Sequence, residues 1–222
     1  MTISYCLPCH MRTADLERAL PYMIAAADAA TDVEIVIVDY GNAPPLRIRT
    51  PPYGHVRVAV VRVERPHYHM SHARNVSIRA ATGDYVVISS ADICPQPDFF
   101  RVIRARLEET GAVWLRPDLT YVGVIVCRRD ELIAAGGYDE RIEFYGAEDK
   151  DLQARLLRRQ ANVASYDASA VLTMFRTLNA DKVAHYRLPL TKTAMLEHGS
   201  AIYRENVAAG RLVANEGLAW GQ

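Results

Sequence analysis

A nearly continuous apolar run at residues 33–39, VEIVIVD, constrains the fold of this chain more than any other segment. Apolar side chains fall on both faces of such a strand, and Gly41 follows soon after its final acid. Strands that are apolar on both faces are typical of parallel sheets, because helices cover such sheets on either side. The run therefore predicts a buried parallel strand within an α/β domain.

Strand and helix patterns alternate along the rest of the chain. A short apolar segment at 3–8 precedes a helix that Thr13 can cap, and Pro21 is expected to kink or shorten that helix. We further expect strands at 55–63, 85–89 and 122–128, and helices at 71–81, 98–110, 129–135, 151–159 and about 192–208. This alternation predicts a mostly parallel, twisted sheet that is flanked by helices on both faces.

Composition narrows the class of protein. The chain has 222 residues, of which half are hydrophobic, with 26 basic and 26 acidic side chains. This length suits a single α/β domain over 1–222, and the balanced charge gives no reason to expect a nucleic acid or an anionic membrane as partner. No apolar run reaches the roughly 18 residues of a membrane span, and no basic segment marks a signal peptide. The sequence therefore predicts a soluble, cytoplasmic protein.

The segment CLPCH, residues 6–10, matches the pattern of a covalent haem site. The competing interpretation is a buried strand end that happens to carry two thiols. We favour the second interpretation, because Cys94 and Cys127 stand alone and no second C-x-x-C suggests a zinc site.

Polar residues follow several of the predicted strands. They occur at 8–12, at 39–42 and at 90–92, and ligands of open α/β sheets bind beyond the carboxyl ends of the strands. The chain has neither G-x-G-x-x-G nor G-x-x-x-x-G-K, which excludes the usual dinucleotide fingerprint and the P-loop. A nucleotide held by acids at the strand ends, usually through a divalent cation, is the remaining common solution.

Two longer segments carry a family resemblance. Residues 71–92, SHARNVSIRAATGDYVVISSAD, resemble the A-R-N-to-D-x-D core of inverting family 2 glycosyltransferases of the GT-A fold, and residues 95–99, PQPDF, fit the segment that follows it. Residues 136–141, GGYDER, and 146–151, GAEDKD, are similar to the G-G-x-D-E and G-x-E-D motifs of the β-1,4-galactosyltransferase group. Residues 7–12 resemble that group's donor-binding I-P-F-R-x-R.

The resemblance implies a GT-A-like domain with a Rossmann-like half at about 1–95 for the nucleotide-sugar, an acceptor and catalytic half at about 96–190, and a helical tail at about 191–222. It makes Asp149 the general base, worth about 10²–10⁴-fold in rate, and Glu148 an orienting group for a sugar. The implied sugar and acceptor contacts are Gly136, Gly137, Phe144 and Tyr145. The implied donor contacts are Pro8, His10, Arg12, Asp39, Arg74, Ser90 and Asp92.

The resemblance also implies Mn²⁺ or Mg²⁺ at the donor diphosphate, because a cation held by carboxylates stabilises the charge of the leaving group. Asp92 is the expected ligand, and Met174 aligns with a methionine ligand of the galactosyltransferase group. That group also has a histidine ligand, which this chain lacks at the aligned position, and the nearby His185 is the candidate to replace it.

Two departures put the metal in doubt. Ser90 stands where the family has the first acid of D-x-D, and Thr177 stands where the galactosyltransferase group has its histidine. Weak metal binding, or replacement of the metal by a cation such as Arg176, is the alternative.

Each motif also has a purely structural interpretation. Glu148 and Asp149 at a helix start favourably complement the helix dipole, by about 0.3–1 kcal/mol. Phe144 and Tyr145 are residue types that fill cores. The irregular spacing of the histidines at 67, 69 and 72 favours a surface or nucleotide-side position over a metal site.

The sequence therefore predicts a hexosyltransferase-type enzyme that moves a sugar with inversion from a nucleotide-sugar, a UDP-sugar by preference, to a glycan or other hydroxyl acceptor. The alternatives are a catalytically impaired nucleotide- or glycan-binding protein of the same fold and a nucleotidyltransferase. The latter would need a basic Gly-rich loop, which residues 8–12 do not supply.

Overall fold

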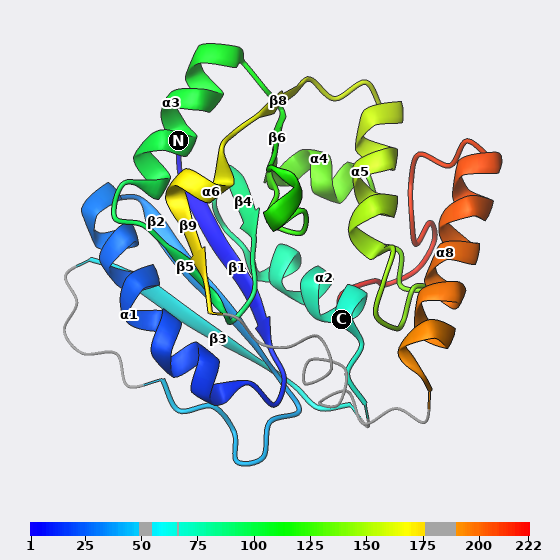
Figure 1. Ribbon diagram of the computed structural model, residues 1–222, viewed down its shortest axis with the longest axis horizontal. Coiled ribbons are helices and arrows are strands. Elements are labelled where there is room, and N and C mark those ends of the chain that lie inside the picture. The colour runs from blue at the N-terminus through cyan, green and yellow to red at the C-terminus, as the bar shows by residue number, and fades with distance from the viewer. Residues whose placement is uncertain (49–54, 66, 176–189) are drawn as a thin grey trace.

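The computed structural model describes residues 1–48, 55–65, 67–175 and 190–222. Its main sheet has seven strands in the order β3-β2-β1-β4-β7-β6-β8, and β5 pairs with β9 in a second, two-stranded sheet (Figure 1). The strands of the main sheet are β1 (Ile3–Cys9), β2 (Val33–Tyr40), β3 (Arg57–Val63), β4 (Tyr85–Ile88), β6 (Trp114–Arg116), β7 (Val126–Arg128) and β8 (Val163–Ser165). Those of the small sheet are β5 (Ile93–Pro95) and β9 (Leu172–Met174).

The helices are α1 (Thr13–Ala30), α2 (Met70–Ala80), α3 (Phe99–Thr110), α4 (Arg129–Ala134), α5 (Glu148–Arg158), α6 (Ala168–Val171) and α8 (Lys192–Ala208), with a 3₁₀ turn, η1, at Leu119–Tyr121. Among the described residues, no helix has both the length and the apolar character that crossing a membrane requires.

Strands β1 and β2 lie between β3 and β4 in the sheet, and every residue of both strands is buried. They run parallel in register from Ile3 opposite Val33 to Cys9 opposite Asp39. Strands β3 and β4 extend the parallel region on either side, whereas β7 runs antiparallel between β4 and β6. The predicted mostly parallel α/β sheet is confirmed.

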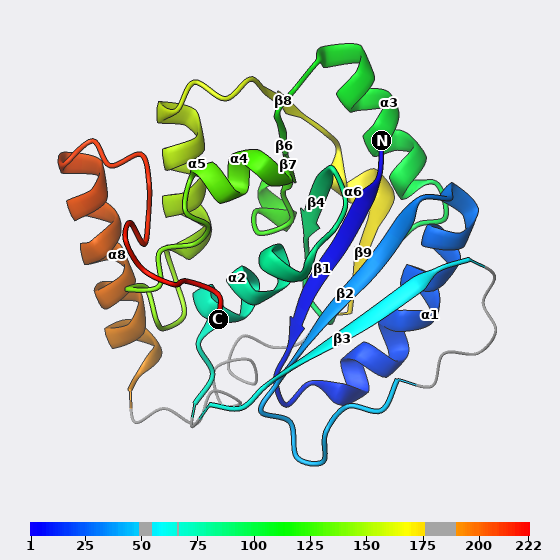
Figure 2. The ribbon, with the colours of Figure 1, turned by 180° about the vertical axis from the view of Figure 1, so that it is seen from behind.

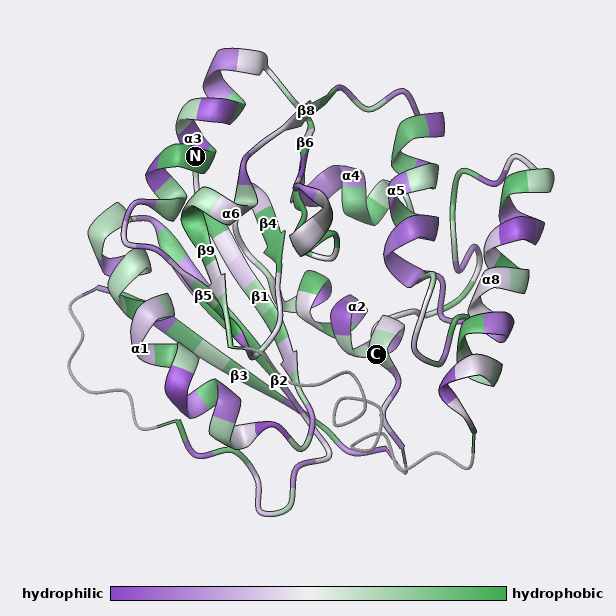
Figure 3. Ribbon diagram, in the orientation of Figure 1, coloured by the Kyte–Doolittle hydropathy of each residue, from purple (hydrophilic) through white to green (hydrophobic). Residues whose placement is uncertain are grey.

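Side chains of the central strands alternate between two helix layers, as the period of a strand requires. Tyr5 and Leu7 of β1 pack in one core with α1 and α3, whereas Cys6 packs in a second core with Ile78 of α2 and Leu132 of α4. Helix α1 lies in front of β2 and β3 in Figure 1 and behind them in Figure 2, on the face opposite α2. Figure 3 shows polar and apolar residues alternating along α1, the pattern of a helix with one buried side.

This alternation also decides the C-x-x-C-H interpretation. Cys6 and Cys9 are buried, and they lie in the cores on opposite faces of the sheet. Two thiols on opposite faces of a strand cannot attach one haem, so the segment is the buried strand end that the sequence favoured.

Several expected elements differ in extent. Helix α1 begins at Thr13 and runs to Ala30, so Pro21 does not shorten it. Pro21 lies on the exposed side, where water can satisfy the carbonyl that a proline leaves unpaired. The strand expected at 122–128 is reduced to β7, because residues 121–124 form a turn closed by a hydrogen bond from Val124 N to Tyr121 O at 2.7 Å.

The C-terminal segment returns to the sheet-flanking helices. Helix α8 packs beside α5, and buried Asn206 of α8 donates hydrogen bonds to Asp139 (2.9 Å) and to Asp151 of α5 (2.7 Å). The final residues then run back along α2 (Figure 1): Trp220 is buried beside its last turn, with the Arg79 guanidinium 4.1 Å above the ring, and the Gln222 carbonyl oxygen lies 2.9 Å from His72 Nε2 in its first turn.

We expect Gly136→Ala to destabilise the fold by about 3 kcal/mol, because it combines strain at φ +73° with overpacking. A Cβ at Gly136 would lie 2.0 Å from the Ala214 carbonyl oxygen of the returning tail. Gly111 is the matched control, since it has φ +59° and no atom within 4 Å of an added Cβ. In thermal melts, where 1 kcal/mol corresponds to roughly 2–4 °C, equal shifts for both variants would refute the close approach.

Candidate active site

The carboxyl ends of β1, β2 and β4 bring the predicted donor residues to one edge of the sheet. His10 and Arg12 follow β1, Asp39 lies near the end of β2, and Ser90 and Asp92 follow β4. Because these three strands are parallel neighbours, their ends meet, as ligand sites of open α/β sheets require.

Asp92 is the most enclosed acid of this edge, with a side chain that is 1% exposed. The Ser90 hydroxyl donates a hydrogen bond to its Oδ1 at 2.5 Å, and Nη2 of Arg12 lies 2.9 Å from its Oδ2. Arg12 in turn donates from Nε and Nη2 to Asp15 at 2.9 and 2.7 Å. The structure therefore brings Arg12, Ser90 and Asp92 together as one cluster.

Asp39 supports the loop that follows β2. Its carboxylate accepts hydrogen bonds from Asn42 Nδ2 (2.6 Å), Leu46 N (3.0 Å) and Arg62 Nη1 (2.7 Å), and its side chain is almost fully buried. These contacts fix the loop at 42–46. Contact between Asp39 and a nucleotide stays a prediction.

His10 belongs to an aromatic cluster beside this edge. Its ring stacks on Tyr68 with centroids 4.8 Å apart and planes 6° apart, and its Nδ1 lies 2.6 Å from the Tyr40 carbonyl oxygen. Pro8, another predicted donor residue, lies inside β1 and is buried opposite Val38. His10, in contrast, follows the end of the strand.

Asp149 lies at the start of α5, where its carboxylate meets two groups from elsewhere in the chain. Its Oδ1 pairs with Nη1 of Arg74, from α2, and accepts a hydrogen bond from the Tyr138 hydroxyl at 3.3 Å. Gly123 approaches from the other side, where an added Cβ would lie 2.9 Å from Asp149 Oδ2. Asp149 keeps 17% of its side-chain surface exposed.

The contacts of Tyr138 and Gly123 went unrecognised in the sequence. Tyr138 lies within the GGYDER segment, so the motif was a usable signal for it, and the ring of Tyr138 also stacks under the Arg74 guanidinium at 4.9 Å. Gly123 lies outside every motif, and no pattern marked it.

Glu148 is buried beside Asp149. The Gly146 amide donates to its Oε2 at 3.0 Å, and Nη1 of Arg74 lies 3.5 Å from its Oε1. Burial and the neighbouring Asp149 raise the pKa of the Glu148 carboxyl to about 7, although Arg74 acts in the opposite direction. The two predicted acids therefore differ in environment: Asp149 is partly exposed, whereas Glu148 is enclosed.

The two aromatic residues before α5 contact the tail helix. Phe144 packs against His198 with ring centroids 5.3 Å apart, and the Lys192 ammonium lies 5.7 Å from the centre of the Tyr145 ring. Burial, then Glu148 and Asp149, raise the pKa of the Tyr145 hydroxyl. Both rings are half-buried, and a sugar-binding role for them stays a prediction.

Gly136 and Gly137 are enclosed by other parts of the chain. An added Cβ at Gly137 would lie 2.4 Å from Asn75 Oδ1 and 2.8 Å from Trp220, while Gly136 faces Ala214. Their described contacts are those of a tightly packed turn, and their contact with an acceptor stays a prediction.

The expected metal ligands are only partly described. Met174 lies in β9 opposite Ile93, next to Asp92, whose carbonyl oxygen accepts a hydrogen bond from Phe175 N at 2.9 Å. His185 falls outside the described residues, as do the positions 176 and 177 on which the alternatives rested. Within the described ranges, no three His, Cys, Asp or Glu residues form a group that could hold a metal ion.

Tyr68 connects the two clusters. Its ring stacks on His10 at the end of β1, and its buried hydroxyl has a pKa raised by burial, lowered by Arg74 and raised by Glu148. Tyr68 also packs in a small core with Tyr40 at the end of β2 and Ala73 of α2, so the donor edge lies beside the helix that carries Arg74, the partner of Asp149.

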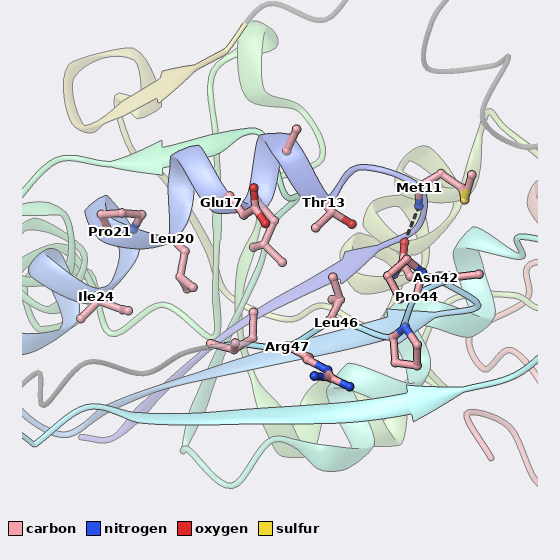
Figure 4. A pocket seen from close by; sticks show the side chains of 15 residues that line it. Met11, Thr13, Glu17, Leu20, Pro21, Ile24, Asn42, Pro44, Leu46 and Arg47 are labelled. Carbon is pink, nitrogen blue, oxygen red and sulfur yellow. Dashed lines mark hydrogen bonds between the residues drawn. The ribbon is translucent and has the colours of Figure 1, made fainter.

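A cavity of about 860 Å³ lies beside this edge, between α1 and the loop at 42–48 (Figure 4). Most of its lining is apolar, including Leu16, Leu20 and Leu46, and the hydrogen bond from Met11 N to Asn42 Oδ1 at 2.7 Å closes one end. It includes none of the predicted site residues, so the chemistry described above lies next to this cavity and not inside it.

The sequence profile of glycosyl transferase family 2 matches residues 4–175, which span the sheet, both clusters and Met174. The chain belongs to glycosyl transferase family 2. No curated protein matches the chain significantly.

Solved structures of glycosyltransferases share the fold of this family 2 chain. TarS 1–349 from S. aureus, in complex with UDP-GlcNAc, matches 94% of the chain and 73% of its own length with a TM-score of 0.60 and 12% identity. The mannosyltransferase PcManGT from Pyrobaculum calidifontis, in complex with GDP-Man and Mn²⁺, matches 93% and 75% with a TM-score of 0.64 and 16% identity. The catalytic domain of Drosophila β1,4-galactosyltransferase 7, in complex with xylobiose, matches 91% and 79% with a TM-score of 0.60 and 14% identity. The GT-A fold expected from the sequence is confirmed.

Glu148 should make the stability of this transferase depend on pH. Its pKa is about 7 in the folded chain against a reference of 4.5, so the folded state holds the proton more tightly and stability falls as pH rises through that window. We expect Glu148→Gln to remove this loss. The difference in unfolding free energy between variant and wild type should therefore shift in favour of the variant by up to roughly 3 kcal/mol between pH 5 and pH 8.

Denaturant unfolding at both pH values measures this difference. Glu108→Gln, on the exposed side of α3, is the control and should show the same offset at both pH values. An offset for Glu148→Gln that does not change with pH would contradict the raised pKa.

Proposed function

We propose that this chain transfers a hexosyl group from a UDP-sugar to an acceptor hydroxyl with inversion, using Asp149 as the general base. The observation that carries the proposal is the Asp149 carboxylate, held by Arg74 and Tyr138 at the start of α5 while part of its surface stays open. Membership of family 2 and the UDP-GlcNAc bound by the similar TarS support the donor class.

In the proposed reaction, the acceptor oxygen attacks the anomeric carbon while its proton passes to an Asp149 oxygen. The bond between the anomeric carbon and the diphosphate oxygen breaks, and UDP leaves with the bonding electrons. A base that is positioned within hydrogen-bond reach contributes about 10²–10⁴-fold to such a step. Arg74 and Tyr138 orient the carboxylate, and the buried Glu148 is suited to hydrogen-bond a sugar hydroxyl.

The donor side of the proposed site is the edge formed by His10, Arg12 and Asp92. The Arg12 guanidinium suits a diphosphate, since its planar set of N–H donors matches phosphate oxygens. The stacked rings of His10 and Tyr68 provide an aromatic surface at the same edge. The acceptor proposed is a glycan or another alcohol, because an attacking hydroxyl must lose its proton and Asp149 can accept it.

The similar Pyrobaculum enzyme holds Mn²⁺ with its GDP-Man, and the sequence led us to expect such a cation at Asp92. The residues present at this edge do not fit one. Ser90 replaces a carboxylate, and both oxygens of Asp92 are engaged by Ser90 and Arg12. The proposed reaction therefore contains no step through a metal.

Asp149→Asn should lower turnover of a UDP-sugar about 100-fold and change UDP affinity little, because the amide keeps the shape of the side chain and cannot accept the proton. The lost charge also leaves the buried Arg74 without its closest partner, so a lower melting temperature is expected and turnover is compared well below it. Lys150→Gln, the exposed neighbour on α5, is the matched control. Full turnover in Asp149→Asn would remove Asp149 as the base.

Nucleotide binding can be tested without knowledge of the acceptor. We expect UDP at about 100 times its Kd to stabilise the fold by about 2.7 kcal/mol, which raises the melting temperature by roughly 5–10 °C. GDP and CMP at the same concentration should shift the melt less. A larger shift with GDP would reassign the donor base, and no shift with any nucleotide would contradict donor binding.

A further inference from the structure

We propose that the Arg12 guanidinium takes the cation position beside Asp92, so that this transferase binds and uses its nucleotide-sugar without a divalent metal. This inference rests on the proposed function, and it assigns Arg12 the stabilisation of charge on the leaving diphosphate. Three observations support it: the occupation of Asp92, the identity of residue 90, and the way in which Arg12 is held.

Asp92 makes a hydrogen bond and an ion pair with protein groups. Its side chain is 1% exposed, Ser90 Oγ lies 2.5 Å from Oδ1, and Arg12 Nη2 lies 2.9 Å from Oδ2. A metal bound here would have to displace the guanidinium from a nearly dry site, where separating a paired carboxylate from its partner is costly.

Ser90 weakens the site for a metal further. Mn²⁺ and Mg²⁺ prefer charged oxygen ligands, and a D-x-D motif offers two carboxylates where this chain offers one. The Ser90 hydroxyl donates its hydrogen to Asp92, so it strengthens the carboxylate's orientation and adds no negative charge. Across the described segments, no cluster of three His, Cys, Asp or Glu side chains compensates for the loss. The thioether of nearby Met174 is uncharged, so it does not replace the missing negative charge.

Arg12 is held in place on two sides. Asp15, in the first turn of α1, accepts from both Nε and Nη2, while Asp92 contacts Nη2 from the end of β4. Only 15% of the Arg12 side chain is exposed. A guanidinium has its five N–H donors in one fixed plane, and two carboxylates fix the direction of that plane. In this arrangement Asp92 orients a cation of the protein itself.

The decisive experiment compares metal-free with metal-loaded protein. The full chain is stripped with EDTA, and calorimetry measures UDP affinity with EDTA and with added Mn²⁺, beside a titration of Mn²⁺ alone. We expect UDP affinities within about threefold of each other and no binding of Mn²⁺ alone. A UDP affinity at least tenfold weaker in EDTA, or UDP-sugar turnover that appears only with Mn²⁺, would overturn the inference. Absence of nucleotide binding under every condition would instead defeat the proposed function.

Variants assign the effect to Arg12. Arg12→Gln should weaken UDP binding in EDTA by about 10- to 100-fold, the size expected for charge-assisted hydrogen bonds. Arg101→Gln removes an exposed arginine from α3 and should leave UDP affinity unchanged. In the double variant Arg12→Gln with Ser90→Asp, the first substitution removes the cation beside Asp92 and the second adds a carboxylate. Together they create a metal site, so Mn²⁺ should restore UDP binding. Equal UDP affinity for Arg12→Gln and wild type would contradict the assignment, and the wild-type comparison decides the question even where a variant fails to fold.

Discussion

The burial of β1 and β2 on both faces is the constraint on which the rest of the structure depends. Every residue of both strands is buried, because α1 and α3 cover one face of the sheet and α2 and α4 cover the other. Polar groups that must meet a ligand can therefore stand only beyond the strand ends. Since β1, β2 and β4 are parallel neighbours, these ends coincide, and hydrophobic burial alone places the donor edge.

The second half of the site is organised around one buried cation. Arg74 has a side chain that is 9% exposed, and burying its charge requires compensation from Asp149 and Glu148. With a pKa raised to about 7, Glu148 is about half protonated at neutral pH, so the net charge of the trio lies between zero and minus one. The acids that open α5 thus serve the fold and the proposed chemistry together, which is why the helix-dipole interpretation and the catalytic one are compatible.

The C-terminal segment is part of the scaffold of this site. An added Cβ at Gly199 of α8 would lie 2.1 Å from the Gly146 carbonyl oxygen, one turn before the acids of α5. Asn206 ties the same helix to Asp139 and Asp151, and the returning tail closes over Gly136. Three separate contacts therefore position the loop that carries Phe144, Tyr145 and the start of α5.

The sequence by itself determined the α/β class, the central strands, the helix at 192–208 and the family, because periodicity, burial and motif spacing are local properties of the chain. The three-residue strands β5, β6, β8 and β9 are too short to carry a period, and only pairing defines them. Motif resemblance assigned Arg74 to the donor and Asp92 to the donor and a metal, but it did not predict their protein partners, which are Asp149 for Arg74 and Arg12 for Asp92. Tertiary structure alone decided these partners, since buried charges select whichever opposite charge the packing of helices on the sheet brings within reach.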